Sequence, residues 1–257
     1  MLTRQRKEML LNLLKQDGQI VAKALSEQLG LSEDTIRRDL RELAKEGLLQ
    51  RVHGGALPLP PSSPAMGDFA ARQQLSVEAK PSIARAAAAM IQPGQVVFID
   101  GGTTAVQLAR QLPHDLRCTV ITHSPSIAVE LVDHPLAEVI LIGGRLFKHS
   151  IVAMGPAALE QIAQIHTDLY FMGVCSLHPE HGISTGDCDE AGTKRAIARM
   201  ARRTVVLASP EKLDTVSPFQ IAPLSQVSAI VVQADTPKAL LKPYRDMGIA
   251  ITLAAAK

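Results

Sequence analysis

Six short apolar runs, rich in valine and isoleucine, follow one another between residues 95 and 232, with helical stretches between them. The runs are QVVFID (95–100), TVIT (119–122), EVILIG (138–143), TDLYFMGV (167–174), TVVLAS (204–209) and AIVV (229–232). Strands that are apolar along their whole length are buried on both faces, which is typical of parallel sheets covered by helices. The larger part of the chain is therefore predicted to be an α/β domain with a mostly parallel sheet.

The N-terminal part has a different pattern, with apolar residues at helical spacing. This spacing predicts three helices: one over about 4–16, a second that ends at Gly30, and a third that begins after Ser32 and ends at Gly47. The stretches LLQRV and GGALP that follow predict a small β-hairpin, or wing, with His53-Gly54-Gly55 near its tip. Three helices and a wing are expected to form a separate small domain.

The third helix has a divided surface. Ile36, Leu40 and Leu43 fall on one side, and Asp34, Arg38, Arg41 and Lys45 fall on the other, with Thr35 and Arg37 at the border. A short turn between two helices, the second of which exposes cations, is typical of a helix-turn-helix that enters the major groove of DNA. A solvated charged helix on a small bundle is the alternative. The Gly30 turn, the serine-capped basic helix and the basic hairpin together favour DNA binding.

Each predicted contact has a role. Thr35 with Arg37 or Arg38 would reach base edges, and Arg41, Lys45 and Arg51 would neutralise phosphates. Ser32 and the helix N-terminus would bind a phosphate, whereas a histidine in a wing more often packs or donates to backbone than reads bases. The residues predicted to contact DNA are Ser32, Thr35, Arg37, Arg38, Arg41, Lys45, Arg51 and His53. The distribution of charge agrees weakly, because the whole net charge of +2 comes from the first 56 residues.

A segment rich in proline and serine, LPLPPSSPAM (57–66), can form neither a helix nor an inner strand. A chain of 257 residues is also longer than a usual single domain. We therefore expect a winged helix-turn-helix domain over 3–58, a linker over 59–75 and an α/β sensor domain over 76–257.

Two glycine-rich turns follow predicted strands of the sensor domain. Asp100-Gly101-Gly102-Thr103-Thr104 lies between a strand and a helix, where backbone N–H groups, threonine hydroxyls and the helix dipole attract an anion. The turn is neither a Walker loop nor a GxGxxG fingerprint, which argues against nucleotides. Gly143-Gly144-Arg145 also follows a strand, and Arg145 could pair with an anion. A tight turn, with a surface arginine in the second case, is the alternative reading of each.

A third polar cluster lies in GISTGDCDEAGTKRAIARM, which contains Asp187, Asp189, Glu190 and Lys194. Glu190 and Lys194 are four residues apart, so on a helix they could form a simple exposed ion pair. In the alternative interpretation, the carboxylates hold sugar hydroxyls while Lys194 meets a negative group.

The segment TIRRDLRELAKEGLLQRVHGGA, Thr35 to Ala56, closely resembles the N-terminal signature of DeoR-family bacterial transcriptional regulators, and the likeness extends through almost the whole chain. The family's D-x-GTT loop corresponds to Asp100, Gly102, Thr103 and Thr104, its E-A-x-x-K element to Glu190 and Lys194, and its GG pair to Gly143 and Gly144. The resemblance implies a sensor domain similar to sugar-phosphate isomerases that binds a phosphorylated sugar. The implied effector-binding residues are Asp100, Gly101, Gly102, Thr103, Thr104, Gly143, Gly144, Arg145, Asp187, Glu190 and Lys194.

Three positions depart from the family pattern. Val21 stands where many members have a hydroxyl residue that caps the second helix. Thr122-His123 replaces the usual T-N pair, and Ser209-Pro210-Glu211-Lys212 replaces D-x-S/T-K. The last two departures leave the identity of the effector open.

Other classes of function find less support. The first residues, MLTRQRKEML, turn amphipathic at once, so we expect no leader. The sequence has no apolar run of about 18 residues that could span a membrane, and its three cysteines lack metal-ligand spacing. We therefore expect a cytoplasmic protein with reduced cysteines, no metal and no cofactor. Few aromatic residues argue against RNA or single-strand binding.

The sequence thus predicts a regulator, most simply a repressor of a carbohydrate operon. Its predicted partners are a double-stranded DNA operator, a phosphorylated sugar and further copies of itself in a dimer or tetramer, since one helix-turn-helix makes few base contacts. One rival is a sugar-phosphate isomerase-like enzyme tethered to DNA, in which Asp187, Glu190 and Lys194 do acid-base work. The other is an architectural DNA protein with an inactive sensor.

Overall fold

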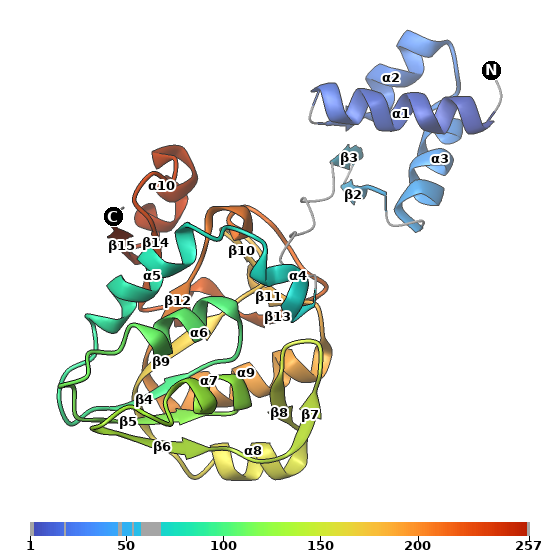
Figure 1. Ribbon diagram of the computed structural model, residues 1–257. Helices are drawn as coiled ribbons and strands as arrows, with labels where there is room; N and C mark the ends of the chain where they lie inside the picture. Colours follow the sequence, from blue (N-terminus) through green and yellow to red (C-terminus); the bar gives the residue numbers. More distant parts are fainter. Residues whose placement is uncertain (1–2, 18, 46–47, 53, 58–67, 256–257) are drawn as a thin grey trace. The chain divides into compact units, whose positions relative to one another are not determined.

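A computed structural model describes residues 3–17, 19–45, 48–52, 54–57 and 68–255. The chain divides into two compact units, residues 1–61 and 62–257 (Figure 1). Among the described residues, no helix combines the length and the apolar character needed to cross a membrane.

The first unit contains three helices and a small antiparallel sheet. The helices are α1 (Thr3–Asp17), α2 (Ala22–Leu29) and α3 (Glu33–Lys45), and the strands are β1 (Ile20–Val21), β2 (Gln50–Val52) and β3 (Gly55–Leu57), in the order β1-β3-β2. The predicted helices and wing are confirmed. The short strand β1, which pairs with β3, was not predicted because two residues carry no readable periodicity.

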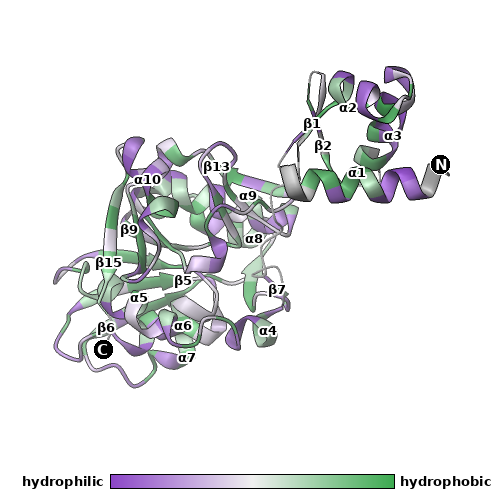
Figure 2. Ribbon diagram, turned by 90° about the horizontal axis from the view of Figure 1, so that it is seen from above, coloured by the Kyte–Doolittle hydropathy of each residue, from purple (hydrophilic) through white to green (hydrophobic). Residues whose placement is uncertain are grey.

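The core of the first unit forms where the apolar faces of the helices meet. Leu10 of α1 and Ile36, Leu40 and Leu43 of α3 are almost fully buried. The helices alternate between hydrophobic and hydrophilic colours in Figure 2, as amphipathic helices do. The periodicity of α3 was therefore a reliable guide to its buried side.

The start of α2 lacks a side-chain cap. Val21 occupies the N-cap position and makes no capping hydrogen bond with its side chain. The backbone N–H of Ala22 instead donates to the carbonyl of Gly54 in the wing, at 2.9 Å. The wing thus satisfies one of the free N–H groups at the start of α2, although not those of the next two residues, from which a hydroxyl at position 21 would accept.

The second unit is built on a seven-stranded parallel sheet with the order β15-β14-β12-β9-β4-β5-β6. The strands are β4 (Val96–Ile99), β5 (Cys118–Thr122), β6 (Ala137–Leu141), β9 (Thr167–Gly173), β12 (Ala201–Leu207), β14 (Ala229–Gln233) and β15 (Ala250–Ala254). The six apolar runs are confirmed as the first six of these strands. The edge strand β15 was not predicted, since its side chains are half exposed and it lacks a continuous apolar run.

Helices cover both faces of this sheet. One face packs against α5 (Ala79–Ala88), α6 (Thr103–Arg110) and α7 (Pro125–Glu130), and the other against α8 (Pro156–Ile162), α9 (Cys188–Met200) and α10 (Lys238–Asp246). In β4, Val97 and Ile99 point to the face covered by α5, α6 and α7, and Phe98 points to the face covered by α8, α9 and α10. This two-sided burial explains why the strands are apolar throughout.

Smaller elements flank the sheet. A hairpin of β7 (Arg145–Phe147) and β8 (Val152–Met154) follows β6, and β10 (Ser176–His178), β11 (Gly182–Thr185) and β13 (Phe219–Ala222) form a separate antiparallel sheet. Two 3-10 turns, η2 (Pro210–Lys212) and η3 (Leu224–Gln226), complete the unit.

A short helix, α4 (Phe69–Gln73), lies inside the segment 59–75 that was expected to be a linker. The side chain of Asp68 caps it by accepting from the N–H of Ala71 at 2.8 Å, and Phe69 is buried in the core of the second unit. The linker expectation is therefore wrong for residues 68–75, which belong to the second unit. The proline-rich composition that suggested a linker ends before Asp68.

Candidate functional site

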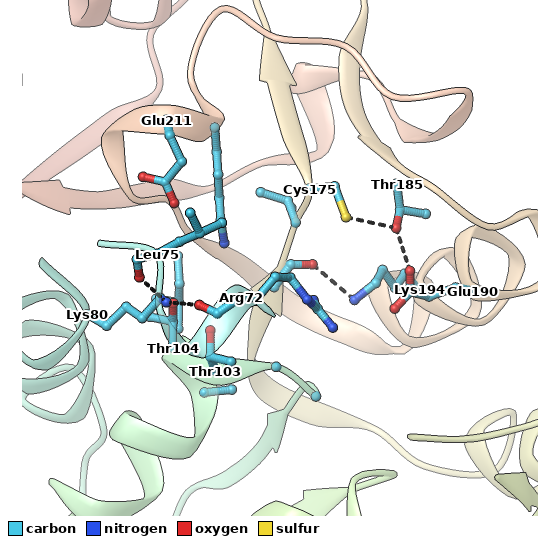
Figure 3. A pocket seen from close by; sticks show the side chains of 17 residues that line it. Arg72, Leu75, Lys80, Thr103, Thr104, Cys175, Thr185, Glu190, Lys194 and Glu211 are labelled. Atoms are coloured by element: carbon cyan, nitrogen blue, oxygen red, sulfur yellow. Dashed lines mark hydrogen bonds between the residues drawn. The ribbon is translucent and has the colours of Figure 1, made fainter. Parts of the chain in front are cut away.

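The sheet of the second unit has a topological switch point between β4 and β9. From β4 the chain continues to β5 and β6 on one side, and it then returns to β9, β12, β14 and β15 on the other. In open parallel sheets, ligands bind at such a point, outside the carboxyl ends of the strands. A pocket lies there, and its lining comprises Arg72, Leu75, Lys80, Gly101–Ala105, Gly173–Cys175, Thr185, Glu190, Lys194, Leu207, Glu211 and Lys212 (Figure 3).

Asp100, at the end of β4, lies beneath this pocket and is completely buried. Its carboxylate accepts hydrogen bonds from the Tyr170 hydroxyl (3.0 Å), the Gly173 N–H (3.0 Å) and the Gly101 N–H (2.8 Å), and it also pairs with His123 and Lys194. Burial alone would raise the pKa of Asp100, but Lys194 and His123 together hold that pKa well below its ordinary value. Five donors thus hold the carboxylate of Asp100, which connects the end of β4 to β9, to α9 and to the residue after β5.

His123 supports the same carboxylate. Its Nε2 lies 2.9 Å from Oδ1 of Asp100, and its Nδ1 lies 3.0 Å from the carbonyl oxygen of Ala153 in β8. The ring therefore bridges the carboxylate of Asp100 and the backbone of β8. The histidine that departs from the family's T-N pair thus ties the loop after β4 to β8.

Lys194, on α9, lines the pocket, but its ammonium is committed to the protein. It pairs with Asp100 and donates to the carbonyl of Gly173 at 3.0 Å. Burial would lower its pKa, yet Asp100 and Glu190 raise the pKa above its ordinary value. In the structure Lys194 meets the negative charge of Asp100, and its contact with an effector stays a prediction. The simple alternative of an exposed Glu190–Lys194 pair is wrong, since both side chains are buried.

Glu190 contributes an acidic wall to the pocket. Its carboxylate accepts hydrogen bonds from the hydroxyls of Thr185 and Ser150. Burial would raise the pKa of Glu190, but Lys194 and these hydroxyls bring the pKa below its ordinary value. At neutral pH the carboxylate is therefore ionised and can accept further hydrogen bonds.

The turn before α6 is shaped by its two glycines. A Cβ atom at Gly101 would lie 2.1 Å from Cγ1 of Val152, and Gly102 has a φ of 124°, a conformation that favours glycine. Thr103 and Thr104 then open α6, and the buried hydroxyl of Thr104 has no hydrogen-bond partner within the described part of the chain. The turn, the helix N-terminus and this hydroxyl all border the pocket.

Besides Asp100, which lies beneath the pocket, four residues expected at the effector site do not line it: Gly143, Gly144, Arg145 and Asp187. The first three follow the edge strand β6, two strands away from β4. Arg145 lies exposed, 3.7 Å from Asp189. Asp187 caps α9 by accepting from the N–H of Glu190 at 2.9 Å. The structure does not bring these four residues to the pocket, and their role at an effector site stays a prediction. A glycine pair after a strand does not reveal which strand stands at the centre of the sheet.

Three cations of the pocket were not predicted from the sequence: Arg72 on α4, Lys80 on α5 and Lys212 at the end of η2. Lys212 is buried, and no described residue accepts a hydrogen bond from its ammonium. Burial lowers its pKa to about 8. The family-like stretch that ends in Lys212 was a signal that could have found this residue, whereas Arg72 fell in the expected linker.

In the first unit, α3 carries the expected charged surface. The Ser32 hydroxyl accepts from the N–H of Thr35 at 3.2 Å and so caps the helix. Arg38 and Arg41 are exposed, and Arg37 is exposed and pairs with Glu33 at 2.7 Å. These side chains, with Ser32 and Thr35, remain predicted DNA contacts.

A shallow depression between α3 and the wing is lined by Arg37, Arg51 and Gly54, among others. The structure therefore brings Arg51 of β2 near the basic helix. The side chain of Lys45 and the whole of His53 lie outside the described residues. No group of three metal-ligating side chains occurs in the part of the chain that the structure describes.

A winged helix-turn-helix unit and an α/β unit with a pocket at its switch point together define a class, the two-domain DNA-binding regulators. Residues 6–59 match the DeoR-like helix-turn-helix domain, and residues 75–234 match the DeoR C terminal sensor domain. The chain belongs to the DeoR family of DNA-binding transcriptional regulators.

Individual relatives agree with this assignment. The HTH-type transcriptional regulator GlpR of Haloferax volcanii is 36% identical over 231 residues, which are 90% of each chain. The Glycerol-3-phosphate regulon repressor of Escherichia coli K12 is 30% identical over 249 residues, covering 97% of this chain and 98% of the relative. Among solved structures, a ribose 5-phosphate isomerase A from Methanocaldococcus jannaschii superposes with a TM-score of 0.38 and 17% identity, over 52% of each chain. The two relatives by sequence carry the names of regulators, not enzymes.

Proposed function

We propose that this regulator represses an operon for the use of a sugar or polyol, and that a phosphorylated sugar or polyol bound in the pocket releases it from DNA. The observation that carries the proposal is the buried ammonium of Lys212, which borders the pocket without an acceptor among the described residues. A buried cation is costly unless it is paired. An anionic ligand would supply the missing partner.

The N-terminus of α6 supports an anion at the same place. Backbone N–H groups at a helix start carry partial positive charge and are free to donate. Thr103 and Thr104 add hydroxyls, one of which is buried and unpaired in the described structure. We assign the phosphate to this turn together with Lys212, and the glycines Gly101 and Gly102 to the shape of the turn.

The opposite wall suits the hydroxyl groups of a sugar. The ionised carboxylate of Glu190 accepts hydrogen bonds, and the hydroxyl of Thr185 lies beside it. Asp100, His123 and Lys194 hold the floor of the pocket rather than contact the ligand. The relative named Glycerol-3-phosphate regulon repressor favours a small phosphorylated polyol as one member of this ligand class.

The DNA half of the proposal assigns base contacts to Thr35, Arg37 and Arg38, and phosphate contacts to Ser32, Arg41, Lys45, Arg51 and His53. One recognition helix reads few base pairs, so at least two copies of the chain would bind paired half-sites. The regulator would act in the cytoplasm, where its operator lies. Induction requires that the effector bind the DNA-free form more tightly than the DNA-bound form.

The test is fluorescence anisotropy of the full-length protein on DNA from upstream of its own and neighbouring genes, titrated with phosphorylated sugars and polyols at fixed salt. We expect tight DNA binding that one of these compounds weakens by at least tenfold. Lys212→Met should bind DNA normally and lose the response. Lys242→Met, which removes an exposed lysine on α10, should behave as the wild type.

Tight binding that no compound changes would contradict the effector assignment and leave the DNA assignment standing. Turnover of a sugar phosphate would instead support the rival enzyme.

A further inference from the structure

Helix α4 is the first described element after residues 58–67, the segment of sequence that joins the two units. It is fastened to the second unit at several points. Phe69 is buried, and its backbone N–H donates to the carbonyl of His149 at 2.9 Å. The ammonium of Lys80 donates to the carbonyls of Arg72 and Leu75. The hydroxyl of Ser76 donates to Glu211 at 2.5 Å.

Arg72 connects this helix to the pocket. Its Nη2 donates to the carbonyl of His149 and to the hydroxyl of Ser150, both at 3.2 Å, and its Nε donates to the carbonyl of Asp68 at 3.4 Å. All three acceptors are neutral, and no described carboxylate forms an ion pair with this guanidinium. In the view of Figure 3, Arg72 lies between the threonines of α6 and the Glu190–Lys194 pair.

The surroundings of Arg72 are electropositive. Burial is the main cause of the lowered pKa of Lys212, and the positive charges of Arg72 and Lys80 lower that pKa further. The three cations therefore repel one another electrostatically. Glu211, an acidic residue of the pocket lining, already accepts from the hydroxyls of Ser209 and Ser76. Charge-assisted hydrogen bonds to phosphate are about twice as strong as those to neutral acceptors. A phosphate in this pocket would therefore compete well for the guanidinium.

Two of the three partners of Arg72, His149 and Ser150, lie in the loop between β7 and β8. Ser150 in that loop also donates to Glu190, and β8 accepts from His123 through Ala153. The same loop therefore contacts both α4 and the floor of the pocket. Exchange of the Arg72 contacts would loosen α4 where the chain enters the second unit.

We propose that Arg72 binds the phosphate of the effector and exchanges its bonds to His149 and Ser150 for it, so that α4 reports the occupied pocket to the segment leading to the DNA-binding unit. This step rests on the proposed phosphorylated effector. It makes Arg72 a ligand contact and a coupling residue at once, and it gives α4 a role that its position in the sequence alone did not suggest.

The experiment uses full-length protein with glycerol 3-phosphate and inorganic phosphate as probes, followed by calorimetry and by hydrogen exchange of a peptide covering residues 68–76. In the wild type, we expect binding of at least one probe and faster exchange at the Phe69 amide when the pocket is filled. Arg72→Gln keeps donors for the neutral acceptors but loses the charge. It should bind the probe at least tenfold more weakly and bind operator DNA within about twofold of the wild type, without release by the probe.

Two further variants separate coupling from folding. Ser150→Ala removes a partner of the empty state and keeps the guanidinium, so it should bind the probe more tightly than the wild type. Arg110→Gln, which changes an arginine of α6 paired with Glu130, should match the wild type in every assay.

A wild-type response to the probe that Arg72→Gln retains in full, or unchanged exchange at residues 68–76 on binding, would overturn this inference alone. If the wild type binds neither probe, and no phosphorylated compound releases DNA, the proposed effector class fails and the inference fails with it.

Discussion

The protonation of the Lys212 ammonium depends on whether an anion occupies the pocket. Burial lowers its pKa to about 8, below the value of 10.5 that it has in an unfolded chain. Between these two values the unfolded state binds more protons, so this group makes the folded state more stable as the pH rises through that window. A bound anion reverses the preference, because it favours the charged ammonium.

The affinity for a phosphorylated ligand should consequently fall as the pH rises above about 8. Binding must then return a proton to Lys212, so the loss approaches about tenfold per pH unit. Calorimetry with glycerol 3-phosphate at pH 7, 8 and 9 measures this slope. Lys212→Arg keeps its charge over this range and should show a much flatter profile; an equally steep decline in that variant would assign the proton to another group, such as Lys80.

At the residue scale, the sequence predicted part of the site. Thr103, Thr104 and Glu190 do border the pocket, because a glycine turn after a central strand and a helix starting with acidic residues have local signatures. The partners of a side chain have no such signature. Nothing in the sequence shows that Asp100 is saturated by five donors, that Lys194 is one of them, or that Arg72 reaches the pocket from α4.

At the scale of elements, the ion pair between α1 and α3 makes the same point: the sequence pattern predicts the helices but not which side chains pair between them. Periodicity predicted both helices and the apolar stripe of α3. It also left Asp39 beside that stripe, where the structure buries it completely and pairs it with Arg6 of α1, Nη2 to Oδ1 at 3.1 Å. This bidentate ion pair fixes how α1 crosses α3, and thus how the recognition helix is held.

Asp39→Ala should destabilise the first unit by about 3–5 kcal/mol, because it leaves the Arg6 charge buried without a partner. Both tyrosines lie in the second unit and the chain has no tryptophan, so unfolding is best followed by far-UV circular dichroism of the full-length protein in urea. Asp34→Ala, at an exposed position of the same helix, should cost no more than about 1 kcal/mol. Equal stability of the two variants would mean that the buried pair does not hold α1 to α3.

At the scale of the whole molecule, DNA binding and effector binding are assigned to different units. The factor by which the effector weakens DNA binding is therefore a third quantity, separate from either affinity. In the proposed function, operator affinity depends on side chains of α3 and the wing, and effector affinity depends on the pocket of the second unit. Changes in one unit should therefore leave the intrinsic affinity of the other unchanged, since no residue is shared. Only variants of the segment that begins with α4 are expected to alter the factor by which the effector weakens DNA binding.

Arg38→Ala tests this separation from the DNA side. Arg38 is exposed on α3 and has no ion-pair partner among the described residues, so its guanidinium is free to contact a base edge. Loss of a bidentate base contact should weaken operator binding by about 1–3 kcal/mol and leave non-specific binding nearly unchanged.

Arg51→Ala, which removes a predicted phosphate contact, should weaken both operator binding and non-specific binding and reduce the salt dependence by about one counterion. For both variants, anisotropy with operator and random DNA should give the wild-type fold-release by glycerol 3-phosphate. An altered release in either would place part of the coupling in the DNA-binding unit itself.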